Sequence, residues 1–331
     1  MNLGIDSFKY LGRSLSHMKF KKILITGFEE SALDEPYLER LSKLADKRIC
    51  VPKDSPVLPK ELADTDCLLV KFNPVNKEWF NNAPHLKYVG VFATGYGQVD
   101  VASAREKGIV VCNVPGYSTE SVAEFVFAVL LEHIREVGRA KQQAREGNYS
   151  EAGFSASELR NKAFGILGLG SIGSRVAEIA LGFGAKVHYW SRNRKKDYEQ
   201  KGIRFETPES LLSSCDFISL HLARAKETEL FLSKERIHKI KSGAVVVCTV
   251  PMELVDIDAL DQRLAKGDMT FILDHPDEML AENLKKLVRH SNCVIYPPIG
   301  YVSREAGIAK QEIFIANLEH FLKGTPINKV N

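Results

Sequence analysis

The sequence lacks the cysteine spacing that marks a zinc site or a disulfide framework. Its 331 residues include six cysteines, and no two of them are spaced as CxxC. Most of them lie in apolar, strand-like runs, which favours buried free thiols in a reducing compartment. We therefore expect neither a metal site nor a disulfide framework. The six are Cys50, Cys67, Cys112, Cys215, Cys248 and Cys293.

Long apolar runs and a strong excess of charge are also missing. No apolar run approaches the roughly 18 residues that a membrane span needs, and the first twenty residues lack the apolar core of a secretory signal. Their basic and serine residues leave a transit peptide as an alternative, but a cytoplasmic location is expected. The net charge of +3 is too small to indicate a nucleic-acid partner.

The sequence does contain a regular alternation of short apolar runs and helical patterns. This alternation predicts an α/β protein with mostly parallel sheets. A first unit over residues 21–115 should hold strands at 21–27, 48–52, 67–71, 88–93 and 109–114. A second unit begins at AFGILGLGSIG (163–173), with further strands at 185–191, 216–222, 243–250, 269–274 and 293–297. A last helix over 304–324 should end at a C-cap glycine, Gly324.

Residues 119–147, which contain no proline, are predicted to form one long helix that links the two units. Ser121 and Glu124 have the spacing of a capping box at its start, and the helix should end near Gly147. Its broad apolar face would pack either against a second subunit or within the same chain. The pattern does not distinguish these two alternatives.

A GxGxxG motif follows the apolar strand FGILG and opens a helix, and this context indicates a dinucleotide-binding turn. Gly168 permits the tight turn, Gly170 lets a pyrophosphate approach the backbone, and Gly173 lets the helix pack closely on the strand. The N–H groups at the helix start, at Ser171 and Ile172, would face the phosphates. A plain glycine-rich turn is the alternative.

The end of the next strand indicates which dinucleotide binds. An acidic residue normally stands there to hold the ribose 2′-hydroxyl, but this sequence has Ser191 followed by Arg192 and Arg194. A serine and arginines would bind a 2′-phosphate that a carboxylate would repel. The segment therefore favours NADP(H), with NAD(H) and a solvated basic loop as the alternative.

Several segments, in order along the chain, are typical of one family. They are ATGYGQVD (93–100), NVPGYSTESVAE (113–124), ELRNKAFGILGLGSIG (158–173), LVDIDAL (254–260) and the closing NLEHFLKGTPINKVN. With these motifs the chain resembles the D-isomer-specific 2-hydroxyacid dehydrogenases, which include glyoxylate/hydroxypyruvate reductases and 3-phosphoglycerate dehydrogenases. The HYWSRNRK segment is similar to that of the NADP-preferring reductases in this family.

The resemblance implies two Rossmann-like doubly wound domains separated by a cleft. Residues 1–115 plus 303–331 would form a flavodoxin-like substrate domain, and residues 116–302 the NAD(P)-binding domain. The helix at 119–147 would serve as a hinge and as the interface of a homodimer. The expected ligand besides the coenzyme is a small-molecule substrate of unknown identity.

The resemblance also implies roles for single residues. The backbone N–H groups of Gly95 and Tyr96 would hold the substrate carboxylate, helped by Lys71. Asp274 would bind the nicotinamide amide, and the backbone near Thr249 would line the same pocket. A strand-end charge at Lys71 and a loop cap at Asp274 are the structural alternatives.

The catalytic positions are where the chain departs from the family. The family's arginine lies in a segment like NTARGGLVD, which here is CTVPMELVD, so that Pro251 occupies its position. The histidine lies in a segment like LTPHIAG, which here is IYPPIGY, so that Pro298 occupies its position. The glutamate position falls on Met279 by strict counting, or on Glu278 with a slip of one residue.

Two prolines cannot replace these groups, because proline offers no proton and no backbone N–H. A general acid contributes about 10²–10⁴-fold, and an oxyanion-type donor about 10²–10³-fold. His275, Tyr296 and Tyr301 are the candidates for a substitute acid, whereas His221 is expected to be structural. Three hypotheses follow: an NADP(H)-dependent oxidoreductase with changed chemistry, a non-catalytic nucleotide-binding protein, and a weak glyoxylate or hydroxypyruvate reductase.

Overall fold

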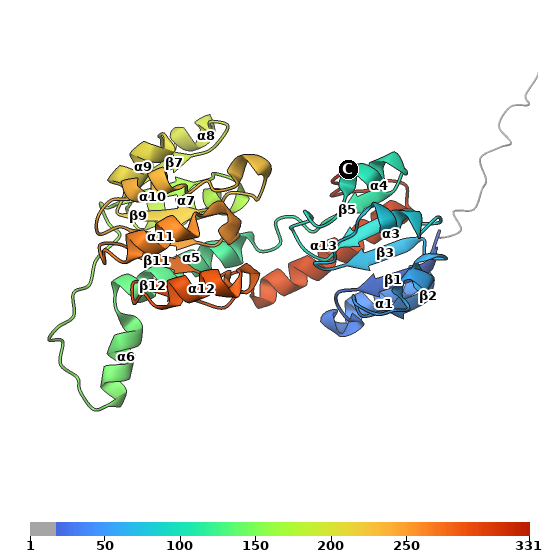
Figure 1. The fold of residues 1–331 in the computed structure, drawn as a ribbon, viewed down its shortest axis with the longest axis horizontal. Coiled ribbons are helices and arrows are strands. Elements are labelled where there is room, and N and C mark those ends of the chain that lie inside the picture. Colours follow the sequence, from blue (N-terminus) through green and yellow to red (C-terminus); the bar gives the residue numbers. More distant parts are fainter. Residues whose placement is uncertain (1–17) are drawn as a thin grey trace, which may run out of the picture. The chain divides into compact units, whose positions relative to one another are not determined.

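The computed structural model describes residues 18–331, and these form two compact units (Figure 1). Unit 1 comprises the chain up to Tyr117 together with Gly307–Asn331, and unit 2 comprises Ser118–Ala306. The first unit is thus built from both ends of the chain. Each unit has its own parallel sheet, and each is described by itself below.

Unit 1 contains a five-stranded parallel sheet in the order β2-β1-β3-β4-β5. The strands are β1 (Phe20–Thr26), β2 (Ala45–Cys50), β3 (Cys67–Val70), β4 (Tyr88–Val91) and β5 (Val110–Cys112). The helices are α1 (Glu35–Lys43), α2 (Leu58–Leu62), α3 (Lys77–Asn81), α4 (Val101–Glu106) and α13 (Arg304–Leu322), with a 3-10 turn at η1 (Glu30–Ala32). Since the strands are parallel, β3, β4 and β5 end side by side at one edge of the sheet.

The long helix α13 packs on this sheet through aromatic rings. Phe314 lies 4.7 Å from Phe92, and Phe321 stacks on Phe20 at 5.6 Å, measured between ring centroids. The helix ends in a Schellman motif, in which Gly324 has φ +77° and the Thr325 N–H donates to the His320 carbonyl at 3.0 Å. The predicted C-cap glycine is confirmed.

Unit 2 contains a seven-stranded parallel sheet in the order β12-β11-β10-β9-β6-β7-β8. The strands are β6 (Ala163–Leu167), β7 (Lys186–Trp190), β8 (Arg204–Phe205), β9 (Phe217–Leu220), β10 (Val245–Cys248), β11 (Thr270–Leu273) and β12 (Cys293–Ile295). The strand order reverses between β6 and β9, which is the topological switch point of a Rossmann fold. The predicted fold class, α/β with two Rossmann-like parallel sheets, is therefore confirmed.

Helices cover both faces of this sheet. They are α5 (Thr119–Ile134), α7 (Ser171–Gly182), α8 (Lys196–Glu199), α9 (Pro208–Ser214), α10 (Lys234–Lys239), α11 (Ile257–Leu264) and α12 (Ala281–Val288). Short 3-10 turns stand at η2 (Lys226–Thr228), η3 (Met252–Leu254) and η4 (Pro276–Glu278). On one face, α5 packs through Phe127, which stacks on Phe164 at 5.6 Å and on Phe183 at 5.4 Å.

The prediction of one helix over residues 119–147 is wrong. The chain forms α5 and a separate helix α6 (Val137–Arg145), with Glu136 between them in the left-handed region at φ 51°. The Glu136 carboxylate accepts the Ser155 N–H at 2.9 Å, and Glu132 accepts the Gly138 N–H at 3.1 Å. The first hydrogen bond ties Glu136 to the chain beyond α6, and the second satisfies an N–H group in the first turn of α6 that has no intrahelical acceptor.

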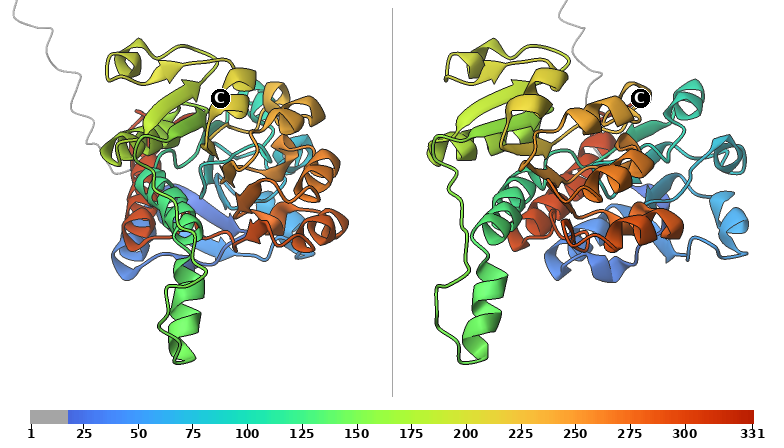
Figure 2. Two further views of the ribbon diagram at one scale, coloured as in Figure 1. Left: turned by 90° about the vertical axis from the view of Figure 1, so that its left-hand side faces the viewer. Right: turned by 60° about the vertical axis from the view of Figure 1, so that its left-hand side comes forward.

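The predicted capping box is also wrong. Ser118 is the N-cap residue of α5, and the Ser121 hydroxyl instead donates to the Gly300 carbonyl at 2.9 Å. Figures 1 and 2 show that α6 extends away from the other elements of unit 2, and none of its residues is buried.

All six cysteines are free thiols, and only Cys50 is exposed. No helix in the described part of the chain is long and apolar enough to cross a membrane.

Candidate functional site

The glycine turn of unit 2 has the geometry of a dinucleotide cradle. Gly168 has φ +103°, and a Cβ there would lie 2.5 Å from the His221 carbonyl oxygen. A Cβ on Gly173 would lie 2.0 Å from the Gly168 oxygen, so only glycine lets α7 pack this closely on β6. A Cβ on Gly170 would meet nothing within 4 Å, so the backbone there is open to a ligand.

An open pocket of about 540 Å³ lies at the start of α7. Gly170, Ser171 and Lys195 line it, together with Arg175, whose charge is compensated by Glu120 at 2.7 Å and Glu178 at 3.3 Å. The first N–H groups of a helix have no intrahelical acceptor, and they carry the positive end of the helix dipole. Ser171 and Ile172 supply these N–H groups. The pocket therefore fits the pyrophosphate of a dinucleotide.

The two predicted arginines in the loop after β7 differ in whether their charge is already paired. Arg194 forms an ion pair with Glu199 at 2.5 Å and lies over the Phe205 ring at 4.9 Å, so its charge is already compensated. Arg192 is exposed, and within residues 18–331 no hydrogen bond or ion pair engages its side chain. Ser191 donates to the Asn193 carbonyl at 2.5 Å, which tightens the turn beneath Arg192. Arg192 is thus the arginine of this loop that can reach an anion without losing a partner.

Asp274 follows β11 and carries an unpaired acceptor. Its side chain is 2% exposed, and its Oδ2 atom accepts the Gly300 N–H at 3.1 Å. Within the described chain its Oδ1 atom is buried with no hydrogen-bond partner, and His275 Nε2 lies 3.7 Å from it. Burial raises the pKa of the Asp274 carboxyl above its ordinary value. The residue caps the Gly300 loop, and the free oxygen also fits the amide N–H of a nicotinamide.

Pro251 stands at the carboxyl end of β10, where it begins the turn η3. It is half-buried, and its carbonyl accepts the Leu254 N–H at 3.2 Å. Thr249, two residues earlier, directs its hydroxyl to the Leu220 carbonyl at 3.5 Å. No side-chain donor from residues 249–251 is therefore directed away from the sheet.

Pro298 lies in the loop after β12 and is half-buried, whereas Pro297 beside it is exposed. Tyr296 does not provide a substitute acid at this point, because its hydroxyl donates to Glu132 on α5 at 3.4 Å. Tyr301 is partly buried, and within residues 18–331 its hydroxyl has no partner. Among the predicted substitutes, His275 and Tyr301 thus stay candidates.

The two candidates for the glutamate position, Glu278 and Met279, lie in different environments. Glu278 is exposed at the end of η4, whereas Met279 packs against the hydrophobic core of unit 2. His221 is held by a short hydrogen bond between its Nε2 atom and Ser219, and burial lowers its pKa to about 3. A buried, neutral imidazole agrees with the structural role predicted for His221, although its Nδ1 atom has no hydrogen-bond partner within the described residues.

The predicted substrate residues lie together at one edge of the unit 1 sheet. Lys71 directly follows β3, and Gly95 and Tyr96 lie in an exposed loop after β4. The loop is held by Asn113, whose amide donates to the Thr94 carbonyl at 2.7 Å. The strand order brings these segments together.

Lys310 on α13 lies at the same edge, although it was not among the residues predicted from the sequence. Its ammonium group is 4.1 Å from the centroid of the Phe92 ring. One signal was available: Ala306 and Phe314, four residues before and after it, are both buried apolar residues. Residues spaced by four share one face of a helix, so a lysine between them points toward the core side.

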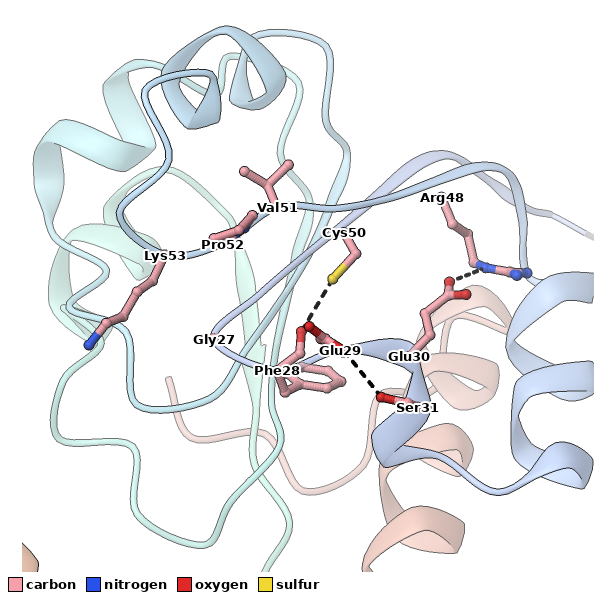
Figure 3. A pocket seen from close by; sticks show the side chains of 10 residues that line it. All are labelled: Gly27, Phe28, Glu29, Glu30, Ser31, Arg48, Cys50, Val51, Pro52 and Lys53. Atoms are coloured by element: carbon pink, nitrogen blue, oxygen red, sulfur yellow. Dashed lines mark hydrogen bonds and ion pairs between the residues drawn. The ribbon is translucent and has the colours of Figure 1, made fainter.

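A second open pocket of about 680 Å³ lies at the carboxyl ends of β1 and β2 in unit 1 (Figure 3). Arg48 pairs with Glu30 at 2.7 Å, and the Cys50 thiol donates to the Phe28 carbonyl at 3.4 Å. Burial, with help from Glu29 and Glu30, raises the pKa of Cys50. None of the predicted site residues lines this pocket.

Comparisons with known proteins show which family the chain belongs to. Residues 127–300 match the family model described as D-isomer specific 2-hydroxyacid dehydrogenase, NAD binding domain. The chain is 36% identical over 293 residues to a glyoxylate reductase of Thermococcus litoralis, which covers 85% of this chain and 88% of that protein. It is 35% identical over 283 residues to a hydroxypyruvate reductase of Blautia hydrogenotrophica, covering 82% and 86%.

A solved structure of an acyclic imino acid reductase in complex with NADPH and D-Arg is also similar. It superimposes with a TM-score of 0.82 at 29% sequence identity and covers 94% of this chain and 100% of that one.

Proposed function

Because the chain belongs to the family of D-isomer specific 2-hydroxyacid dehydrogenases, we propose that it is an NADP(H)-preferring oxidoreductase whose acceptor is not a simple 2-oxo acid. One observation carries this proposal: Pro251 and Pro298 stand where the resemblance expects the catalytic arginine and histidine. Neither proline donates a proton or a hydrogen bond. An acceptor that needs both donors would react slowly at such a site.

We expect the acceptor to be an imino acid. A bound reduced nicotinamide supplies a hydride in this chemistry. A protonated imine already carries its proton and a positive charge on nitrogen, so hydride addition to carbon completes the amine without an acid from the protein. The same charge makes a polarising arginine unnecessary. The similarity to the imino acid reductase solved with NADPH supports this choice.

The remaining residues would bind and orient. The N–H groups of Gly95 and Tyr96, with Lys71, would hold the acceptor's carboxylate. The free oxygen of Asp274 would hold the nicotinamide amide, and Ser191 with Arg192 would receive the 2′-phosphate. These are the steps for which the chain retains the needed donors and acceptors.

An acceptor screen tests the proposal. NADPH oxidation is measured with 2-oxo acids alone, with 2-oxo acids plus an amine that forms the imine in solution, and with aldehydes and enones. The imine mixtures are expected to react at least about 10²-fold faster than the 2-oxo acids alone, because only the latter need the missing acid. The amine without the 2-oxo acid is the control. Faster reduction of glyoxylate alone than of any imine mixture would contradict the proposal.

Two other functions are outcomes of the same screen. The names of the relatives, glyoxylate reductase and hydroxypyruvate reductase, favour weak reduction of those two acids as the second candidate. Silence with every acceptor despite tight NADPH binding would instead favour a non-catalytic nucleotide-binding protein.

The coenzyme preference has its own test. Arg192→Ala is expected to weaken NADPH binding about tenfold through loss of one charge-assisted contact, with little change for NADH. Ser191→Asp is expected to reverse the preference, since a carboxylate repels the 2′-phosphate and accepts from a ribose hydroxyl. Fluorescence titration of both coenzymes measures the effect, and Lys196→Ala at the exposed start of α8 is the matched control. Equal losses for NADPH and NADH would contradict the assignment.

The proposed assembly is a homodimer through the coenzyme-binding unit in the cytoplasm. Its support is that none of the residues of α6 is buried within the chain.

A further inference from the structure

The feature of interest is a pair of lysines at the sheet edge of unit 1. Lys310 on α13 directs its ammonium group over two rings, at 4.1 Å from the centroid of Phe92 and 5.4 Å from that of Tyr117. Lys71 follows β3 next to the Phe92 ring, because Val70 pairs with Val91 in the sheet and the Phe92 N–H donates to the Val70 carbonyl at 2.8 Å. Aromatic faces attract a cation, but they carry no net negative charge. The rings thus compensate the charge of Lys310 only in part.

The two lysines have no acidic counterpart. Among the residues that the structure describes, neither Lys71 nor Lys310 forms an ion pair with a carboxylate. Burial and the charge of Lys71 lower the pKa of Lys310 to about 8. The elements packed against Lys310 contribute uncharged rings, Phe92 after β4 and Tyr117 after β5. Lys71 is the charged group that acts on Lys310. A partly buried cation with a cationic neighbour is stabilised by an anion from outside.

Further donors lie at the same edge. The loop after β4 exposes the N–H groups of Gly95, Tyr96 and Gly97, and within residues 18–331 none of them donates to a backbone or side-chain acceptor. Beside Lys71, Phe72 has φ 56°, a left-handed conformation that is rare for a bulky residue. Strained backbone of this kind collects at ligand sites. Two lysine ammonium groups and three free N–H groups together offer more hydrogen-bond donors than the two oxygens of one carboxylate can accept.

We infer that Lys310 and Lys71 form an anion site on unit 1 that takes a small organic dianion. The step from this ligand to the substrate rests on the proposed function: the acceptor would then carry a second acidic group beyond the carboxylate at its reacting end. Lys310 is the residue that specifies this class. The dianion is either a dicarboxylate or a compound with a phosphate group, and both offer two negative charges to the same donors.

Binding should be linked to proton uptake by Lys310. An anion favours the charged form of an amine and raises its pKa. Because burial and the charge of Lys71 lower the pKa of Lys310 to about 8, part of the Lys310 population is neutral in the free protein at pH 8. Binding is therefore expected to be accompanied by measurable proton uptake at this pH.

Titration calorimetry of the full chain without coenzyme provides the test. Oxalate, inorganic phosphate and acetate are titrated at pH 8 in two buffers of different ionisation enthalpy, which gives the number of protons taken up. Oxalate is expected to bind at least tenfold more tightly than acetate. Tight binding of oxalate alone assigns a dicarboxylate, and tight binding of phosphate assigns a phosphate-bearing acid.

Three variants separate the site from a structural role. Lys310→Met should weaken oxalate binding at least tenfold and abolish the proton uptake. Lys310→Arg, which stays charged, should keep the affinity within about threefold and lose only the uptake. Lys323→Met, at the exposed end of the same helix, should change neither. If oxalate and phosphate do not bind, or if Lys310→Met binds oxalate with unchanged affinity, the site is refuted. No turnover is involved, so a silent acceptor screen leaves this result unaffected.

Discussion

Replacing Pro251 with arginine and Pro298 with histidine together is expected to raise NADPH-dependent glyoxylate reduction by about 10²–10⁴-fold. The arginine restores a donor for the keto oxygen, and the histidine restores a general acid. Both positions follow parallel strands of one sheet, β10 and β12, at their carboxyl ends. Ligands of open α/β sheets bind outside these ends. Steady-state kinetics with glyoxylate and NADPH measures the gain.

The matched control is Pro297→His in the Pro251→Arg background. Pro297 adjoins Pro298 but is exposed, so a histidine there is expected to give little of the gain. Each single variant should give less than the double variant, because the two groups act on one transition state and are not additive. A folded double variant that binds NADPH as the parent does, yet shows no gain, would mean that the two prolines do not occupy the catalytic positions.

Gly173→Ala is expected to weaken NADPH binding by about 10²-fold or more. The added Cβ would lie 2.0 Å from the Gly168 carbonyl oxygen, so α7 must move away from the turn. Such a shift displaces the N–H groups of Ser171 and Ile172 from the phosphates, and small misplacements of positioned groups cost about 10²-fold. Fluorescence titration with NADPH measures the loss.

Gly182→Ala at the other end of α7 is the control. A Cβ there would meet no atom within 4 Å, and alanine is a better helix former by up to about 1 kcal/mol. This variant should bind NADPH as the parent does and unfold at an equal or slightly higher temperature. Unchanged NADPH affinity in a folded Gly173→Ala variant would contradict the assignment of this turn to the pyrophosphate.

The strands show how far apolar patterning carries a prediction. Buried strands such as β3, β4 and β10 are continuous apolar runs, and these were predicted close to their observed bounds. The edge strand β2 was predicted at 48–52 but spans Ala45–Cys50, and the short edge strand β8 was missed. Edge strands are partly exposed, as the mostly unburied β2 illustrates, so their polar residues do not form an apolar run.

The break between α5 and α6 could not be predicted from local pattern. Helix propensity over residues 119–147 is uninterrupted by proline, and Glu136 is an ordinary helix former. What stabilises the left-handed Glu136 is the hydrogen bond from Ser155, a residue beyond the end of α6. The predicted capping box of α5 was wrong for the same reason, because the Ser121 hydroxyl donates to the carbonyl of Gly300, which is far along the chain.

The sequence by itself determined the features that depend only on local backbone and residue chemistry. The spacing of Gly168, Gly170 and Gly173 requires a tight turn into a helix, and a proline lacks a donor in any fold. The tertiary structure alone decided which side chains have partners: Arg194 pairs with Glu199, Asp274 keeps an unpaired oxygen, and Lys310 lies over the rings of Phe92 and Tyr117. These contacts depend on strand order and on the packing of α13. Both bring together residues that are far apart in the chain, so the hydrophobic periodicity of the sequence does not reveal them.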